Sequence, residues 1–152
     1  MILAGCGGSG AAKSNTQWQT VAAAGLTFQA PASWKVEHAK GRVSATHGSE
    51  LVQVSTFPLT KRYDEKLFVP VATELHTRME EIARQTGGKL GAGSSVTADG
   101  VRSHVYDVTV GGQVDEYTFV LSGKREYLLL CRRTSSGGPD FCKQLVTSFA
   151  RR

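Results

Sequence analysis

The stretch Val101–Cys131, VRSHVYDVTVGGQVDEYTFVLSGKREYLLLC, predicts three consecutive strands joined by two short turns. The turns are Gly111-Gly112 and Ser122-Gly123, and both suit the positive φ angles of two-residue hairpins. The last strand, Tyr127–Cys131, is apolar at consecutive rather than alternating positions, which is typical of a strand covered on both faces. We therefore expect an antiparallel meander whose last strand is central in its sheet.

Four further strands are predicted upstream, at residues 26–30, 34–37, 42–47 and 51–57. Pro31 is expected to end the first of these strands and Pro58 the last, because proline has no N–H to donate to a sheet ladder. Trp34 follows the proline turn, and we expect its side chain in the core.

Two helices are expected to pack on these strands. Apolar residues at three- and four-residue steps predict a helix that starts at Pro70 and stops at Gly87-Gly88. A second helix is expected from about Pro139 to Arg151-Arg152, burying Phe141, Leu145 and Phe149. Runs of hairpin-linked strands with packed helices predict an α+β domain with a mostly antiparallel sheet.

The composition fits one globular domain, with 152 residues, 40% hydrophobic content and 20% charged residues. A net charge of +5 and a pI near 9.3 describe a mildly basic chain. Because this charge is modest for a whole domain, we do not expect nucleic acid as a partner. No run of apolar residues is long enough for a transmembrane helix.

Adjacent basic residues form the candidate interaction sites, namely Lys124, Arg125, Arg132 and Arg133. They could contact lipid headgroups or anionic envelope polymers. The alternative is that they are solvated charges at turns and strand ends. Neighbours within a strand, such as Arg132 and Arg133, point to opposite faces, which weakens the prediction of a single patch.

The N-terminus contains Leu3-Ala4-Gly5-Cys6, which resembles the lipobox of bacterial lipoproteins. That resemblance implies acylation of Cys6 and cleavage before it. Five residues precede Cys6, so either the start is trimmed or mis-assigned, or the match is accidental. Small polar residues follow Cys6, and we interpret residues 1–21 as a lipobox-like start and flexible linker. The alternative is a leader with an incidental cysteine.

Cys131 and Cys142 are predicted to form a structural disulfide in an oxidising compartment. The redox-active C-x-x-C spacing is absent. Two alternatives are a pair of buried free thiols and a metal site, although the sequence offers no further ligands nearby. We expect an extracytoplasmic location, at a bacterial membrane through the lipid anchor.

No catalytic, metal or cofactor site is predicted. His38, His47, His76 and His104 have no metal spacing, and neither a G-x-S-x-G elbow nor a Ser-His-Asp arrangement is present. His76 and Glu80 are a poor pair of metal ligands, and His104 is expected to be hydrogen-bonded or at a strand edge. An enzyme would need a pocket that gathers at least two histidines with acids such as Asp107, Asp115 or Glu116. A hydrophobic-ligand carrier would need an apolar cavity between the sheet and the long helix.

The residues GLTFQAPASWKV, from Gly25 to Val36, resemble the opening of the PsbP-like superfamily, in which a strand ends in proline and tryptophan follows three residues later. The order of the elements over residues 22–150 is also similar. The resemblance implies an α-β-α sandwich over residues 22–152 that acts as a binding or assembly module without shared catalytic residues. The lipobox-like start is most similar to actinobacterial envelope lipoproteins of this superfamily. We therefore expect a non-enzymatic, lipid-anchored module whose partner is an unknown envelope protein, polymer or lipid.

Overall fold

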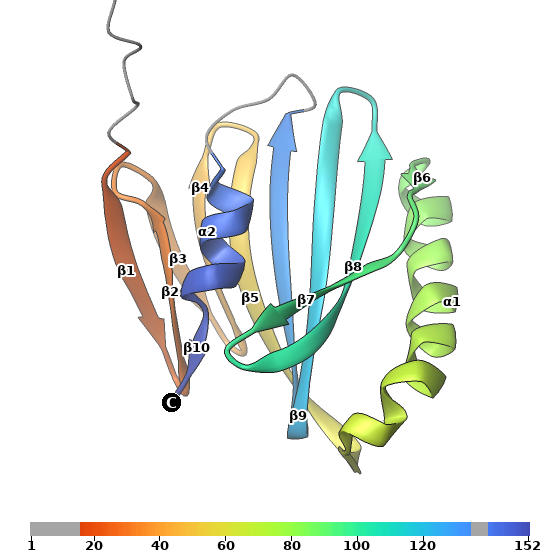
Figure 1. The fold of residues 1–152 in the computed structure, drawn as a ribbon. Coiled ribbons are helices and arrows are strands. Elements are labelled where there is room, and N and C mark those ends of the chain that lie inside the picture. The colour runs from red at the N-terminus through yellow and green to blue at the C-terminus, as the bar shows by residue number, and fades with distance from the viewer. Residues whose placement is uncertain (1–15, 135–139) are drawn as a thin grey trace, which may run out of the picture.

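The computed structural model describes residues 16–134 and 140–152 (Figure 1). The lipobox-like residues lie outside the described residues, and so does Pro139. In chain order the elements are β1 (Trp18–Ala23), β2 (Leu26–Pro31), β3 (Lys35–Ala39), β4 (Arg42–His47), β5 (Glu50–Tyr63), a 3-10 turn (Glu65–Leu67), α1 (Phe68–Thr86), β6 (Lys89–Leu90), β7 (Ser94–Ala98), β8 (Val101–Val110), β9 (Gln113–Thr134), α2 (Phe141–Ser148) and β10 (Ala150–Arg151).

The strands form two antiparallel sheets. The large sheet has the order β3-β4-β5-β9-β8-β6, and β7 pairs with the start of β8. The small sheet has the order β1-β2-β10, so strands from both ends of the described chain flank β2. The mostly antiparallel α+β architecture predicted from the sequence is confirmed.

Strand β9 contains both of the last two predicted strands, because the chain reverses within it (Figure 1). Residues 113–119 pair with β8, whereas residues 123–132 pair with β5. Asp115 and Arg132 are 17 positions apart, yet their side chains are only 2.9 Å apart. A fully extended chain would separate these residues by about 55 Å. Gly123, with φ 59°, lies at the reversal and provides the positive φ expected for this turn.

The two helices cover opposite faces of the large sheet (Figure 1). Leu75 and Met79 of α1 pack in a cluster with Phe119 of β9. On the other face, α2 and the small sheet pack in a separate cluster, which includes Leu129 and Leu145. Successive residues in the second half of β9 alternate between the two clusters, so this strand is central and covered on both sides. The fold is an α-β-α sandwich.

The prediction that α1 begins at Pro70 was wrong by two residues, since the helix begins at Phe68. Proline is tolerated throughout the first helical turn, where backbone N–H groups have no intrahelical acceptor. The prediction that Pro58 closes its strand was also wrong, because β5 continues to Tyr63 with a register shift after Pro58. Pairing with β4 ends at Ser55, so Pro58 lies where β5 has a free edge and its missing N–H removes no bond on that side.

The C-terminal helix is shorter than predicted. It ends at Ser148, and Ala150–Arg151 form β10 rather than a last helical turn. The Arg151 backbone N–H and guanidinium both donate to the Asp99 carboxylate, at 3.0 and 2.7 Å, which holds these residues extended beside β2. At the other end, β1 begins at Trp18, inside the segment expected to be a linker, and pairs with β2 along its whole length.

Candidate functional site

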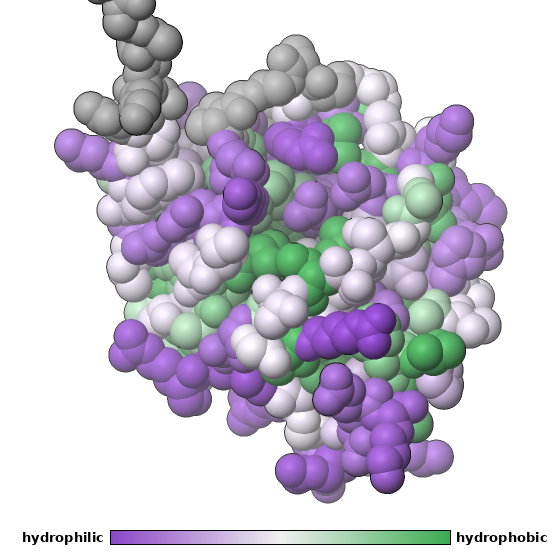
Figure 2. All heavy atoms as spheres, in the orientation of Figure 1, coloured by the Kyte–Doolittle hydropathy of each residue, from purple (hydrophilic) through white to green (hydrophobic). Residues whose placement is uncertain are grey.

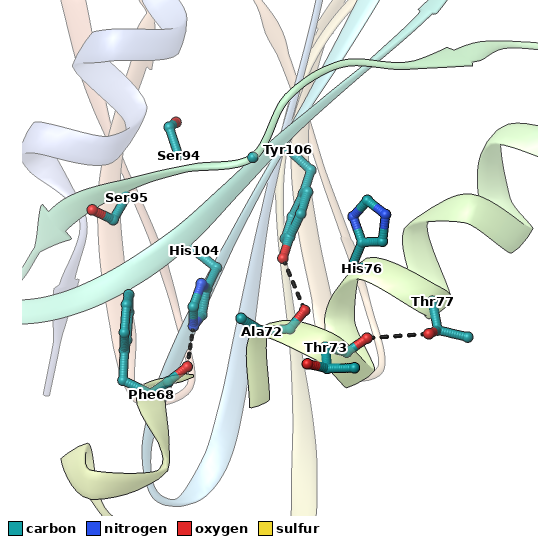
Figure 3. A pocket seen from close by; sticks show the side chains of 10 residues that line it. Phe68, Ala72, Thr73, His76, Thr77, Ser94, Ser95, His104 and Tyr106 are labelled. Carbon is teal, nitrogen blue, oxygen red and sulfur yellow. Dashed lines mark hydrogen bonds between the residues drawn. The ribbon is translucent and has the colours of Figure 1, made fainter. Parts of the chain in front are cut away.

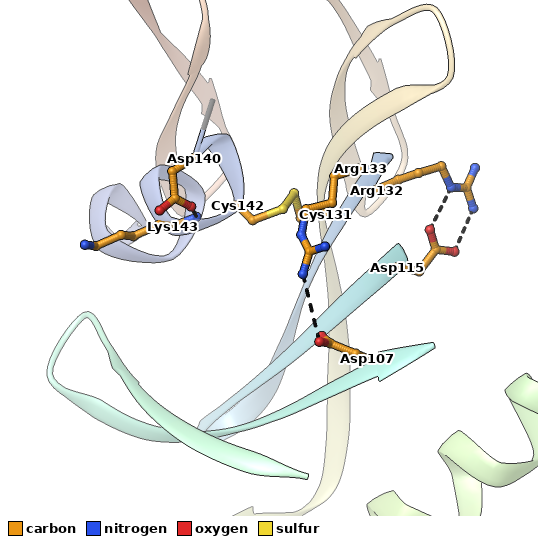
Figure 4. The surroundings of a disulfide bond; sticks show 8 residues. All are labelled: Asp107, Asp115, Cys131, Arg132, Arg133, Asp140, Cys142 and Lys143. Carbon is orange, nitrogen blue, oxygen red and sulfur yellow. Dashed lines mark hydrogen bonds and ion pairs between the residues drawn. A yellow bond between two sulfur atoms is a disulfide. The ribbon is translucent and has the colours of Figure 1, made fainter. Parts of the chain in front are cut away.

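The predicted disulfide is present between Cys131 of β9 and Cys142 in the first turn of α2 (Figure 4). The two Cα atoms are 5.4 Å apart, and both side chains are buried. Asp140 caps the helix, because its carboxylate accepts a hydrogen bond from the Lys143 backbone N–H at 3.1 Å. The disulfide between Cys131 and Cys142 therefore fixes the start of α2 to the central strand.

Arg132 and Arg133 point to opposite faces of the sheet, and each has a carboxylate partner (Figure 4). The Arg132 guanidinium donates to both oxygens of the buried Asp115 carboxylate, at 2.9 and 3.0 Å. These hydrogen bonds raise the pKa of Arg132. Arg133 lies 4.0 Å from the Asp107 carboxylate. Both candidate interaction residues are therefore engaged within the fold, so their charges are compensated before any partner arrives.

A pocket of about 570 Å³ lies between α1 and strands β7 and β8 (Figure 3). His104 is buried in its wall and stacks on Phe68, with 3.9 Å between the ring centroids. The Nε2–H of His104 donates to the Phe68 backbone carbonyl at 2.9 Å, which fixes the neutral tautomer. The guanidinium of Arg102 also packs on the Phe68 ring, 3.9 Å from its centroid. His104 thus holds the first residue of α1 against β8, as a hydrogen-bonded strand residue.

This pocket brings together two histidines but not the acids that an enzyme would need. His76 also lines it, and its ring lies 3.0 Å from the Glu80 carboxylate on an exposed helix face. Asp115 instead contacts Arg132, and Glu116 lies on the opposite sheet face, beside α2. There, burial raises the pKa of Glu116, and the charge of Asp107 raises it further. Among the described residues, no three potential metal ligands gather in one place.

The walls of the same pocket combine apolar and polar side chains. Hydroxyl groups of Thr73, Thr77, Ser94 and Ser95 line it beside the two histidines. Tyr106 is also in the wall, where its hydroxyl donates to a backbone carbonyl of α1 at 3.3 Å. The pocket is therefore mixed in character rather than apolar.

Acidification is expected to destabilise the wild-type fold more than a His104→Gln variant. Burial lowers the pKa of His104 below its ordinary value of 6.5, and the nearby charge of Arg102 adds to the effect. Above pH 6.5 the ring is neutral in the folded and unfolded chains, so its full contribution is present. Below that pH the unfolded chain binds a proton first, and the free energy of unfolding falls until the pH passes the folded-state pKa.

The check is urea unfolding of both proteins between about pH 8 and pH 5. The difference in unfolding free energy between wild type and variant should narrow as the pH falls. If the difference in unfolding free energy between wild type and variant stays constant over this pH range, His104 is not held neutral in the folded chain.

A second concave site, the basic groove, lies at the end of the molecule where β9 reverses. It has a volume of about 650 Å³, and its basic rim is formed by Lys40, Arg42, Lys124 and Arg125. All four side chains are exposed, and within the described residues no carboxylate lies within ion-pairing distance of them. Of the predicted interaction residues, the structure thus leaves Lys124 and Arg125 available and adds two cations that the sequence analysis missed.

The basic groove and the start of β1 are at opposite ends of the domain. In Figure 1 the chain enters β1 at the top, whereas the β1–β2 hairpin, the β3–β4 turn and the reversal of β9 all lie at the bottom. Figure 2 shows hydrophilic side chains at this lower end and also over other parts of the same face. Among the described residues, no helix has the length and apolar character needed to cross a membrane.

The comparisons with known proteins show the fold. No protein-family model matches the sequence, and no curated protein does. The solution structure of cyanobacterial PsbP (CyanoP) from Synechocystis sp. PCC 6803 is similar, with a TM-score of 0.65 over 99% of this chain and 99% of that chain. The chain has a PsbP-like fold. The sequence identity to CyanoP is 16%, so the two proteins are similar in the arrangement of their helices and strands.

A crystal structure from Bacteroides thetaiotaomicron is also similar, at a TM-score of 0.46 and 10% identity, over 85% of this chain and 46% of that chain. The PsbP-like fold expected from residues 25–36 is confirmed by the CyanoP comparison. The sequence signal was the proline that ends β2 and the tryptophan that follows it into the core.

Proposed function

We propose that this PsbP-like chain is a non-enzymatic binding or assembly module, held by an acyl group on Cys6 at the outer face of a bacterial membrane. The basic groove is the observation that carries the proposal. Its four cations have no carboxylate partner among the described residues, and they surround a concave site instead of stabilising the fold. Concave sites with a few convergent polar groups are where proteins bind ligands.

Two features support the location. Disulfides between buried cysteines persist in oxidising compartments, and Cys131–Cys142 is such a bond. Cys6 is the third cysteine, and it follows the small residues typical of a lipoprotein cleavage site. A tether ahead of β1 would leave the basic groove at the end of the domain that faces away from the membrane.

The test of the anchor is metabolic labelling of the full-length gene product with an alkyne fatty acid in its bacterial host. We expect the wild type to carry the label and to fractionate with membranes. A Cys6→Ser variant should lose both properties, whereas the neighbouring Ser9→Ala variant should keep them. Wild-type protein that is unlabelled and free in the cytoplasm would refute the proposal.

A carrier of a small hydrophobic ligand is the second candidate. The observation that favours it is the apolar surface inside the basic groove, which includes Ala24, Ala39 and Pro58. The pocket along α1 favours it less, because hydroxyl groups and two histidines share its walls.

A further inference from the structure

We infer that the basic groove binds an anionic amphiphile, with the anionic head against the four rim cations and the apolar chain along the floor. This inference deepens the proposed function, because it names the ligand class of the groove on which that function rests. It does not depend on whether Cys6 is acylated.

The walls of the groove are held in place by hydrogen bonds between elements. Gly41, with φ 69°, forms the β3–β4 turn, and its carbonyl accepts a hydrogen bond from the Thr56 backbone N–H at 2.9 Å. His38 of β3 donates from Nε2 to the Ala22 carbonyl of β1 at 3.0 Å, which joins the large sheet to the small one. Binding sites that are formed before the ligand arrives lose less entropy on binding. The groove is therefore a built site rather than a gap between loops.

The floor is apolar. The apolar surface open to a ligand is formed by Ala24, Ala39 and Pro58, which are exposed. Leu26, Val43 and Val54 lie beneath this surface, where each is at most 2% exposed. An alkyl chain on this surface would release water from both partners, and this gain is not open to a fully polar anion. The floor thus favours an amphiphile over a phosphate or sugar polymer.

The basic rim of the groove favours a ligand with a negative charge. Lys40 and Arg42 come from the β3–β4 turn, whereas Lys124 and Arg125 come from the reversal of β9. The groove has no acidic lining residue, so four positive charges face one space without compensation. Guanidinium groups bind phosphate and carboxylate oxygens in pairs, and the flexible lysines add point charges. An anionic headgroup complements this arrangement, and a volume of about 650 Å³ accommodates a small ligand.

The probe is dodecyl phosphate below its micelle concentration, titrated calorimetrically into the full chain carrying Cys6→Ser. Inorganic phosphate tests the charge alone, and dodecyl maltoside tests the alkyl chain alone. We expect dodecyl phosphate to bind at least about tenfold more tightly than either. Equal affinity for inorganic phosphate would overturn the inference in favour of a simple anion site. Equal affinity for the maltoside would overturn it in favour of a neutral hydrophobic site.

Two double variants separate the groove from the net charge. The double variant Lys124→Gln with Arg125→Gln is expected to bind dodecyl phosphate at least about tenfold more weakly, because both cations line the groove. Lys61→Gln with Arg62→Gln removes an equally exposed adjacent pair outside the groove and should change the affinity less than about twofold. An equal loss of affinity in both double variants would overturn the inference. Unchanged urea midpoints establish that the variants fold.

A vesicle arm distinguishes a single bound amphiphile from a membrane surface. The same Cys6→Ser protein is sedimented with phosphatidylglycerol vesicles and with phosphatidylcholine vesicles. Binding to the anionic vesicles without binding of monomeric dodecyl phosphate would overturn the inference and indicate surface adsorption. None of these outcomes bears on acylation of Cys6, so failure here and failure of the anchor are distinguishable.

Discussion

Replacing Phe141 with alanine is expected to lower the free energy of unfolding by about 4 kcal/mol. Phe141 is the first residue of α2, and only 1% of its surface is exposed. Its ring meets Trp34 edge to face, with 4.8 Å between the centroids, in the cluster that joins α2 to both sheets. Alanine would leave a cavity at this junction, and the disulfide at the next residue restricts how far the helix can move to fill it.

Urea unfolding followed by tryptophan fluorescence measures this loss, because Trp34 reports directly on the contact. Phe57→Ala is the matched control, since 41% of Phe57 is exposed, and it should cost less than about 1 kcal/mol. Phe141→Leu, which preserves more of the volume, should cost about 1.5 kcal/mol. If Phe141→Ala and Phe57→Ala lose the same stability, the position assigned to Phe141 is wrong.

Removing the disulfide by Cys131→Ala with Cys142→Ala is expected to cost about 3 kcal/mol. The two cysteines are 11 positions apart, and cross-linking a loop of this size restricts the unfolded chain by about that amount. Both sulfur atoms are buried against α2 and β9, so alanine also removes some packing. We expect the lost packing contacts to lie mainly between α2 and the sheet face that it covers.

A reducing agent provides the matched measurement. The urea midpoint of the wild type should drop when a phosphine reductant is added, and the midpoint of the double-alanine variant should not respond. A Cys6→Ser variant should respond as the wild type does. A wild-type midpoint that is indifferent to reduction would show that the bond contributes nothing.

The parts of the fold that the sequence predicted have local signals. Consecutive apolar residues at 127–131 revealed a strand covered on both faces, and Gly123 marked the reversal of β9. The bond between Cys131 and Cys142 was predicted from their positions, at a strand end and a helix start, together with the expected oxidising compartment. Such patterns reflect burial and backbone angles at neighbouring positions, which the sequence displays directly.

The parts that it missed depend on distant partners. Strand β10 has two residues and no alternating pattern, and only its pairing with β2 and the Asp99 carboxylate make it extended. Likewise, nothing near Arg132 in the sequence shows that Asp115 neutralises it. The rim of the basic groove joins turns that are far apart in the chain, so the approach of Arg42 to Arg125 has no local signature.

The small sheet has a consequence for biogenesis. Its central strand β2 lies between β1, which is made first among the described elements, and β10, which is made last. A nascent chain therefore cannot close this sheet until synthesis has passed Arg151. Because the β1–β2 hairpin is also one wall of the basic groove, that wall gains its full support only after Ala150 and Arg151 have been synthesised.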